Sequence, residues 1–112
     1  MRIPIENAAG MAVGETKVFD FLRNGRSAQG FLIRYHDGYH AYLNRCAHWL
    51  VPLDLGDLDF YRADIDRIAC KTHGAHYRPS DGYCDYGPCL GANLESYPVA
   101  VENEGVVVEV PD

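Results

Sequence analysis

The sequence predicts an all-β protein with antiparallel strands, arranged as a small sandwich or barrel. Segments in which apolar and polar residues alternate are separated by strong turn signals at Asn24-Gly25 and Asp37-Gly38. The last two apolar segments flank residues 102–105 and predict the clearest hairpin in the chain. No window shows a convincing helical period with caps. The predicted strands are 17–22, 30–35, 39–44, 67–70, a short strand that includes 76–77, 97–101 and 106–110.

The length and composition of the chain favour one domain over residues 1–112. The chain has 112 residues, of which 47% are hydrophobic, which is enough for one packed core but too few for two domains. The N-terminal strands and the C-terminal hairpin are expected to form a base. Residues from about 45 to 90 are rich in loops and are expected to form a small subdomain on that base.

The charge of the chain excludes one large class of partner. The formal net charge is -6 and Lys and Arg occur as isolated residues, so nucleic acid is not an expected partner. An acidic surface instead suits a protein partner with a basic docking patch. The sequence shows no targeting signal and no stretch near the roughly 20 apolar residues of a membrane span. We therefore expect a cytoplasmic protein without membrane association.

Two short motifs each combine one cysteine and one histidine: Cys46-Ala47-His48 and Cys70-Lys71-Thr72-His73. In a reducing compartment, such cysteines serve metals or redox chemistry more often than disulfides. A zinc finger groups Cys with Cys and His with His, whereas here each Cys precedes a His. The interleaved order favours a two-iron, two-sulfide cluster with both Cys on one iron and both His on the other. The alternatives are a zinc site, or buried Cys with unrelated His.

Mixed ligation by Cys and His has an electrostatic consequence for such a cluster. Two thiolates neutralise the oxidised cluster, whereas four thiolates would leave it negative and harder to reduce. Mixed ligation therefore raises the reduction potential. Gly74, directly after the second motif, allows the backbone to approach closely, and its amide is expected to point at a cluster sulfide.

The two motifs resemble those of the Rieske family, whose members bind a [2Fe–2S] cluster through two Cys and two His. The resemblance covers nearly the whole chain, including a return hairpin at the C-terminal end. It implies a Rieske-like sandwich or barrel base with a small loop-rich cluster-binding subdomain, and one cluster per chain. The implied ligands are Cys46, His48, Cys70 and His73. Further matches are the turn at Pro52-Leu53 and Gly56, then Gly82, and a proline loop at Gly87-Pro88.

The chain departs from the respiratory and photosynthetic members of this family. Val51 and Thr72 stand where those members carry an extra, disulfide-bonded Cys in each ligand loop, and the sequence shows no membrane anchor. The resemblance is therefore to the soluble ferredoxin branch. Ala75 replaces the Ser of high-potential members and Tyr77 keeps their Tyr. This pattern predicts a potential in the lower part of the Rieske range of roughly -150 to +300 mV.

Two further groups of residues have both a simple and a functional interpretation. The acidic spacer between the motifs forms either a docking surface beside the cluster or an ordinary solvated loop, which we favour. Cys84 and Cys89 form either a disulfide or two small thiols near the proline loop, and we favour thiols that are not ligands. The acidic residues of the spacer are Asp54, Asp57, Asp59, Asp64 and Asp66.

The resemblance implies a soluble Rieske-type ferredoxin, which is an electron-transfer protein and not an enzyme. Its expected partners are a flavoprotein ferredoxin reductase and a terminal oxygenase, as in multicomponent dioxygenases of aromatic rings. One alternative is the small subunit of an assimilatory NAD(P)H nitrite reductase, whose partner is the reductase large subunit. Another is an iron–sulfur redox sensor. No catalytic residue is expected, because the sequence contains no hydrolase arrangement and no phosphate-binding loop.

Overall fold

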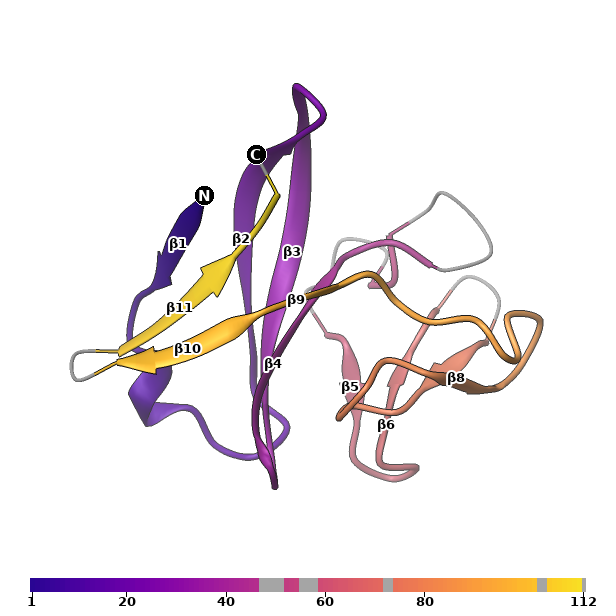
Figure 1. The fold of residues 1–112 in the computed structure, drawn as a ribbon. Helices are drawn as coiled ribbons and strands as arrows, with labels where there is room; N and C mark the ends of the chain where they lie inside the picture. Colours follow the sequence, from indigo (N-terminus) through magenta and orange to yellow (C-terminus); the bar gives the residue numbers. More distant parts are fainter. Residues whose placement is uncertain (47–51, 55–58, 72–73, 103–104, 112) are drawn as a thin grey trace.

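The computed structural model consists almost entirely of antiparallel β-strands, which form three sheets (Figure 1). Among the described residues, the helical structure is the short 3-10 turn η1 (Ala8–Gly10), and no helix is long and apolar enough to cross a membrane. The all-β prediction is therefore confirmed. The residues that the structure describes are 1–46, 52–54, 59–71, 74–102 and 105–111.

The first sheet joins the two ends of the chain. Its strands, in spatial order, are β1 (Arg2–Ile5), β11 (Gly105–Glu109) and β10 (Val99–Glu102). β1 pairs with β11 so that Arg2 lies opposite Glu109 and Ile5 lies opposite Val106. The predicted C-terminal hairpin is confirmed. β1 is not among the predicted strands, because four residues that include a proline carry too weak a pattern.

The central sheet contains the two turns that the sequence predicts in the N-terminal half. Its strands, in spatial order, are β2 (Thr16–Arg23), β3 (Arg26–Tyr35), β4 (Gly38–Leu43) and β9 (Ser96–Tyr97). The turn between β2 and β3 places Asn24 and Gly25 at positive φ angles of 54° and 77°, which an Asn-Gly pair adopts readily. The turns predicted at Asn24-Gly25 and near Asp37-Gly38 are therefore confirmed, and each joins two antiparallel strands.

The third sheet is built from four very short strands. In spatial order they are β5 (Tyr61–Arg62), β6 (Arg67–Ala69), β7 (His76–Tyr77) and β8 (Cys84–Tyr86). The predicted strands at 67–70 and 76–77 correspond to β6 and β7, whereas β5 and β8 are too short to show a period in the sequence. The chain leaves the central sheet after β4 and returns to it at β9, where Tyr97 lies opposite Ala41.

Pro98 divides what the sequence predicts as one strand, 97–101. Tyr97 belongs to β9 in the central sheet, and Val99 begins β10 in the first sheet. Proline has no amide hydrogen to donate, so it fits where the chain passes from one ladder to another. Its carbonyl oxygen accepts a hydrogen bond from the Glu109 amide at 2.9 Å. The prediction of one continuous strand is wrong for this reason.

The central sheet is buried on both faces because it lies between the other two sheets (Figure 1). Phe31 and Ile33 of β3 belong to a core shared with the third sheet, where Phe31 stacks on Phe60 with ring centroids 4.2 Å apart. Leu32, which lies between them, belongs to a second core shared with the first sheet. This arrangement explains why the middle of β3 is continuously apolar, since a strand covered on both faces needs no polar face.

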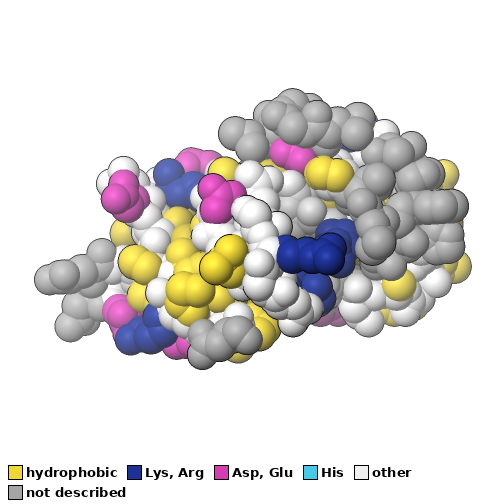
Figure 2. Space-filling view, turned by 90° about the horizontal axis from the view of Figure 1, so that it is seen from above, with side chains coloured by type: hydrophobic (Ala, Val, Ile, Leu, Met, Phe, Trp, Pro, Cys, Tyr) yellow, Lys and Arg dark blue, Asp and Glu magenta, His cyan; other side chains and the backbone are white. Residues whose placement is uncertain are grey.

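The molecule shows two lobes when it is seen from above (Figure 2). One lobe carries the first and central sheets, which we call the base, and the other carries the third sheet. On this face of the base, hydrophobic side chains gather in the middle, and acidic and basic side chains lie around them. Charges of both signs are therefore mixed on the described part of this face.

Candidate metal centre

Cys46 lies just beyond the end of β4, in the core that the central and third sheets share. The residue is 1% exposed. Asn44 fixes the loop that begins here: its Oδ1 accepts a hydrogen bond from the Leu53 amide at 2.8 Å, and its Nδ2 donates to Asp54 at 3.2 Å. The two ends of the first ligand loop are therefore tied together on either side of the predicted ligands.

Cys70 begins a tight turn directly after β6. The Cys70 amide donates to the Ala75 carbonyl oxygen at 2.8 Å, and the Gly74 amide donates to the Cys70 carbonyl oxygen at 2.9 Å. The expectation that the Gly74 amide points at a cluster sulfide is wrong, because the turn itself uses that amide. Cys70 is 1% exposed and lies in the same core as Cys46. Both predicted sulfur ligands are thus removed from water.

A backbone hydrogen bond joins the two ligand loops. The Lys71 amide donates to the Leu53 carbonyl oxygen at 2.9 Å. Leu53 therefore bonds to the first loop through Asn44 and to the second loop through Lys71. The residue is 0% exposed, so these backbone groups are paired in a dry environment. These hydrogen bonds of Leu53 therefore fix the positions of the two ligand loops relative to each other.

Among the described residues, two polar groups lie close to the sulfur of Cys46. The Tyr77 hydroxyl lies 3.3 Å from Cys46 Sγ, and Cys89 Sγ lies 3.5 Å from it. Tyr77, on β7, is 0% exposed, and Cys89 is 3% exposed. Tyr77 therefore places a hydroxyl beside a predicted ligand sulfur. A thiolate at Cys46 can accept hydrogen bonds from both groups, since a hydroxyl and a thiol are both donors.

The loop after β8 covers the second ligand turn. Gly87 adopts a φ of 102°, and a Cβ atom at this position would lie 2.8 Å from Ala75 Cα. A residue with a side chain cannot come this close, so the glycine is what lets the two loops touch. Within the loop, the Leu90 amide donates to the Gly87 carbonyl oxygen at 3.2 Å. The predicted proline loop therefore packs against the turn that begins at Cys70.

Two acidic residues of the spacer have structural roles, so the solvated-loop interpretation is wrong for them. Asp54 is 1% exposed and accepts a hydrogen bond from Asn44. Asp66 accepts hydrogen bonds from the hydroxyls of Tyr61 and Tyr35, the latter at 2.7 Å. These two bonds hold the pKa of Asp66 below its ordinary value. Both carboxylates are therefore engaged in hydrogen bonds within the fold.

The other acidic residues of the spacer are exposed or lie outside the described residues. Asp64 pairs with Arg62 at 2.7 Å, and Asp59 lies 3.6 Å from the Lys71 ammonium. Asp57 lies outside the described residues. A docking surface made from all five carboxylates of the spacer is therefore not formed, because two of the five are engaged within the fold.

All four cysteines are buried thiols, which agrees with the prediction for Cys84 and Cys89. Burial raises the pKa of the Cys84 thiol, and its sulfur donates to the Tyr86 carbonyl oxygen at 3.3 Å. The sequence analysis does not predict that Cys89 Sγ lies 3.5 Å from Cys46 Sγ. The available signal was its position directly after Gly87-Pro88, in the loop expected to cover the cluster.

The two predicted histidine ligands, His48 and His73, lie outside the described residues, as do Val51 and Thr72. Within the described part of the chain, no three His, Cys, Asp or Glu side chains are grouped to hold a metal ion. The two buried thiols nevertheless fit an iron–sulfur cluster. Thiolates are the soft ligands that such clusters take, and an apolar core excludes solvent from them.

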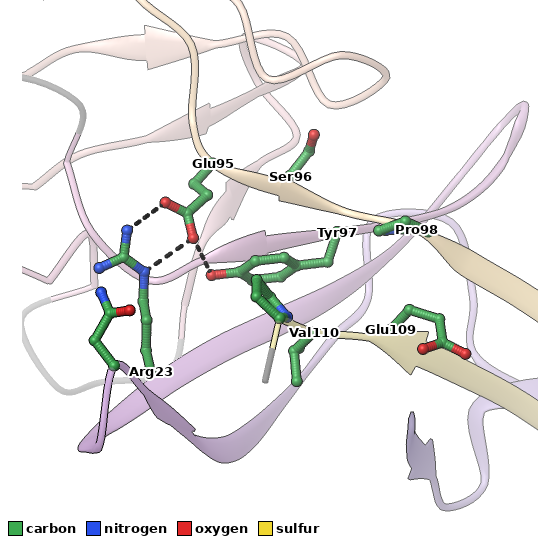
Figure 3. Close-up of a pocket in the computed structure, with 9 residues that line it drawn as sticks. Arg23, Glu95, Ser96, Tyr97, Pro98, Glu109 and Val110 are labelled. Carbon is green, nitrogen blue, oxygen red and sulfur yellow. Dashed lines mark hydrogen bonds and ion pairs between the residues drawn. The ribbon is translucent and has the colours of Figure 1, made fainter. Parts of the chain in front are cut away.

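A separate pocket lies between the β2–β3 turn, β9 and the end of β11 (Figure 3). Arg23 donates to the Glu95 carboxylate from Nη2 at 2.6 Å and from Nε at 3.0 Å. The Tyr97 hydroxyl donates to the same carboxylate at 2.6 Å. These contacts lower the pKa of Glu95 and raise that of Arg23. Arg23 and Glu95 therefore satisfy each other, whereas Glu109, which also lines the pocket, pairs with Arg2 outside it. Neither Cys46 nor Cys70 lines this pocket.

Comparison with solved structures shows that the fold recurs in dioxygenase components. The chain is similar to the ferredoxin of carbazole 1,9a-dioxygenase from Nocardioides aromaticivorans IC177, with 22% identity, a TM-score of 0.71, and coverage of 96% of this chain and 95% of that chain. It is also similar to a chain in the complex of reduced oxygenase and oxidised ferredoxin of carbazole 1,9a-dioxygenase, with 26% identity, a TM-score of 0.69, and coverage of 96% and 91%.

A longer protein contains the same fold as a part. The terminal oxygenase of carbazole 1,9a-dioxygenase from Novosphingobium sp. KA1 is 24% identical with a TM-score of 0.74, and the match covers 99% of this chain but 30% of that chain. A search of curated proteins finds no match. The family model for the Rieske [2Fe-2S] domain matches residues 4–98, which include both cysteine–histidine motifs. The chain therefore belongs to the Rieske [2Fe-2S] domain family, and its cofactor is a [2Fe–2S] cluster.

Proposed function

We propose that Cys46, His48, Cys70 and His73 bind the [2Fe–2S] cluster, with both Cys on one iron and both His on the other. The observation that carries this proposal is the pair of buried thiols at the starts of two joined loops, in a chain of the Rieske family. In the sequence, a histidine follows each thiol by two or three residues. We also propose that residues 1–112 form one domain, with a cluster-binding subdomain at about 45–90.

The function that we propose is that of a soluble ferredoxin, which carries single electrons and is not itself an enzyme. The support is the likeness to a dioxygenase ferredoxin over nearly the full length of both chains. By this likeness, the proposed partners are a flavoprotein reductase that supplies the electron and a terminal oxygenase that receives it. We propose a cytoplasmic location, where thiols remain reduced.

When bound, the cluster takes up and releases one electron, and the residues of the chain set the conditions for this. Burial of Cys46 and Cys70 keeps water away from the sulfur ligands. Leu53, which is bonded to both loops, limits the rearrangement that a change of charge would otherwise cause. The Tyr77 hydroxyl donates toward Cys46 and stabilises negative charge on its sulfur.

Substitution of single ligands tests the assignment, with iron and sulfide content and electron paramagnetic resonance as readouts. Cys46→Ser is expected to lose the cluster, whereas Cys84→Ser, which removes a buried thiol bonded to the backbone, is expected to keep it. His48→Cys is expected to lose the cluster or to lower its potential, because a thiolate adds negative charge. His76→Ala serves as the histidine control. A colourless zinc protein, or an unchanged potential in His48→Cys, contradicts the assignment.

Reconstitution tests the role as a carrier. Mixed with a flavoprotein reductase, NAD(P)H and the oxygenase component of a dioxygenase, the cluster-loaded protein is expected to be required for product formation. The rate of electron transfer is expected to fall as salt is added, because the net charge of -6 favours encounter with a basic partner surface. Reduction without onward transfer to an oxygenase, together with copurification with a sirohaem subunit, would instead indicate a nitrite reductase component.

A further inference from the structure

Three buried sulfur atoms other than Cys70 lie in one region of the core, but they have different neighbours. Cys89 Sγ lies 3.5 Å from Cys46 Sγ, which is within the range of a hydrogen bond between sulfurs. Cys84 Sγ instead donates to the backbone carbonyl oxygen of Tyr86 at 3.3 Å. Of the two cysteines without a proposed ligand role, Cys89 is therefore the one aimed at a predicted ligand sulfur.

The position of Cys89 is fixed by the backbone around it. The Ala92 amide donates to the Cys89 carbonyl oxygen at 2.8 Å, and the Cys84 amide donates to the Ala92 carbonyl oxygen at 2.8 Å. Two residues earlier, Gly87 presses against Ala75, where no side chain would fit. The loop is thus anchored to β8 on one side and to the second ligand turn on the other. The contact between the two sulfurs follows from the fold and does not depend on a freely rotating surface side chain.

The chemistry of the pair depends on which sulfur is charged. A cysteine that binds iron is a thiolate, and a thiolate is an acceptor of hydrogen bonds. A thiol beside it donates its S–H, and hydrogen bonds to a charged acceptor are about twice as strong as neutral ones. Reduction places more negative charge on the ligand sulfurs, so a donor stabilises the reduced state more than the oxidised state. Such hydrogen bonds to sulfur raise the reduction potential.

We infer that Cys89 is a tuning residue, whose S–H donates to the Cys46 sulfur and raises the reduction potential of the cluster. Tyr77 supplies a hydroxyl to the same sulfur at 3.3 Å, so two donors from separate loops converge on one ligand. Ala75, which lacks the hydroxyl of a serine, offers no side-chain donor from the second ligand turn. The thiol of the proline loop therefore adds a donor beside the Tyr77 hydroxyl. This inference rests on the proposed ligand role of Cys46.

Redox titration of cluster-loaded variants tests the inference. Cys89→Ala is expected to lower the midpoint potential, because one donor is lost. Cys89→Ser is expected to fall between Cys89→Ala and the parent protein, because its hydroxyl restores a donor on a shorter side chain. Cys84→Ala is the matched control, and its potential is expected to equal that of the parent. An unchanged potential in Cys89→Ala with an intact cluster overturns the inference.

An infrared measurement on the parent protein gives a second readout, in which Cys89→Ser serves to identify the band. The S–H stretching band of Cys89, identified by its shift in D2O and its loss in Cys89→Ser, is expected to move to lower frequency on reduction as the hydrogen bond strengthens. A band that does not move overturns the inference. So does loss of the cluster from a folded Cys89→Ser, because Cys89 would then be an iron ligand.

The same set of proteins separates this inference from the proposed function. If Cys46→Ser keeps a native cluster, the ligand assignment fails, and the tuning role fails with it. If Cys46→Ser loses the cluster while Cys89→Ala titrates at the parent potential, only the tuning role fails. Both proposals stand when Cys46→Ser loses the cluster and Cys89→Ala keeps it at a lower potential.

Discussion

The side chain of Asn44 orders the first ligand loop through several hydrogen bonds. Its amide group bonds to the Leu53 amide, to Asp54 at 3.2 Å and to Gln29 at 2.7 Å. Leu53 and Asp54 are almost fully buried, so the groups that Asn44 satisfies have little access to water. A buried polar group that loses its partner carries its full desolvation cost. Asn44 therefore acts on the ligand loop without being a ligand.

Asn44→Ala is predicted to destabilise the protein by about 1–3 kcal/mol, because the Leu53 amide and Asp54 each lose a partner. Urea unfolding of the cluster-loaded protein, followed by the visible absorption of the cluster, measures this change. Gln29→Ala is the control, since it removes only the outer contact of Asn44 and leaves the loop bonds in place. Equal losses in the two variants would contradict the role given to Asn44.

Phe60 packs the third sheet onto the central sheet. Its ring stacks on Phe31 with an interplanar angle of 9°, and both residues are at most 1% exposed. Phe60→Ala is predicted to cost about 3–5 kcal/mol, because it leaves a cavity in a shared core. Leu90→Ala, at a residue that is 68% exposed, is predicted to change the unfolding free energy by less than about 0.5 kcal/mol. Comparable losses in the two variants would show that the stacked pair contributes little.

At the scale of residues, the sequence predicts chemistry better than contacts. The two motifs identify Cys46 and Cys70, and the structure buries both. The contact of Cys89 with Cys46 is not predictable, because the two residues are 43 positions apart and meet only after the loops fold. The Gly74 amide is a different failure, since a local hydrogen bond to Cys70 competes with the role expected for it. The spacing of residues in the sequence shows which donors and acceptors are present, but it does not show which of them pair in the fold.

At the scale of elements, the turn between β5 and β6 is held by Asp66. This residue adopts a positive φ of 55° and accepts hydrogen bonds from Tyr61 and from Tyr35 of β3. Burial, together with the bond to Asp66, raises the pKa of Tyr61 to about 12, so the hydroxyl keeps its proton at neutral pH. The turn thus connects the third sheet to the central sheet through one carboxylate.

The hydrogen bonds to Asp66 predict a dependence of stability on pH. Because the folded-state pKa lies below the ordinary value of 3.8, the ionised carboxylate stabilises the fold above about pH 4. This contribution is lost as the pH falls through the folded-state pKa. In thermal unfolding scans, Asp66→Asn is predicted to lower the midpoint near neutral pH and to differ less from the parent protein in acid. Asparagine tolerates the positive φ, so the substitution tests charge with little backbone strain.

Asp64→Asn is the control for this prediction, because Asp64 forms an exposed pair with Arg62. Its unfolding midpoint is expected to follow that of the parent protein at every pH. A difference between Asp66→Asn and the parent that stays constant from neutral to acid would mean that the charge of Asp66 contributes nothing.

The elements that the sequence predicts are the long ones. β2, β3 and β4 carry turn signals and enough residues to show a pattern, and the structure confirms them. β5 has two residues and β8 has three, so neither can express a period of its own. Their pairing depends on neighbours that bring them together. The acidic spacer also depends on tertiary contacts. Its charged composition predicts exposure, but Asp54 is buried where it contacts Asn44.

At the scale of the whole molecule, two cores lie on opposite faces of the central sheet. One core holds Cys46 and Cys70 and contains the short strands β5–β8, and the other is shared with the first sheet. Strands of two or three residues contribute few ladder hydrogen bonds, so their order depends strongly on what they enclose. The first and central sheets have longer strands and their own apolar contacts.

Removal of the cluster is therefore predicted to increase local unfolding of the third sheet and the ligand turns. Hydrogen exchange of the chelator-treated protein is expected to accelerate at the amides of Cys70 and Gly74, which close the second ligand turn. The amides of β10 and β11 are expected to keep most of their protection. Mass spectrometry of peptides from both regions measures the contrast. A uniform loss of protection would show that the two cores unfold as one unit.

The return of the chain at β9 has a consequence for protein engineering. Tyr97 lies opposite Ala41 and Ser96 opposite Tyr42, and the Leu43 amide donates to the Glu95 carbonyl oxygen at 2.9 Å. The segment from 44 to 95 therefore begins and ends on adjacent strands, about 5 Å apart. A short turn can bridge this gap, and segments with close ends are readily exchanged. The segment 44–95 can thus be replaced by a metal-binding segment from another protein. The replacement must cover the face of the central sheet that holds Phe31, Ile33 and Tyr42, or these residues must be made polar.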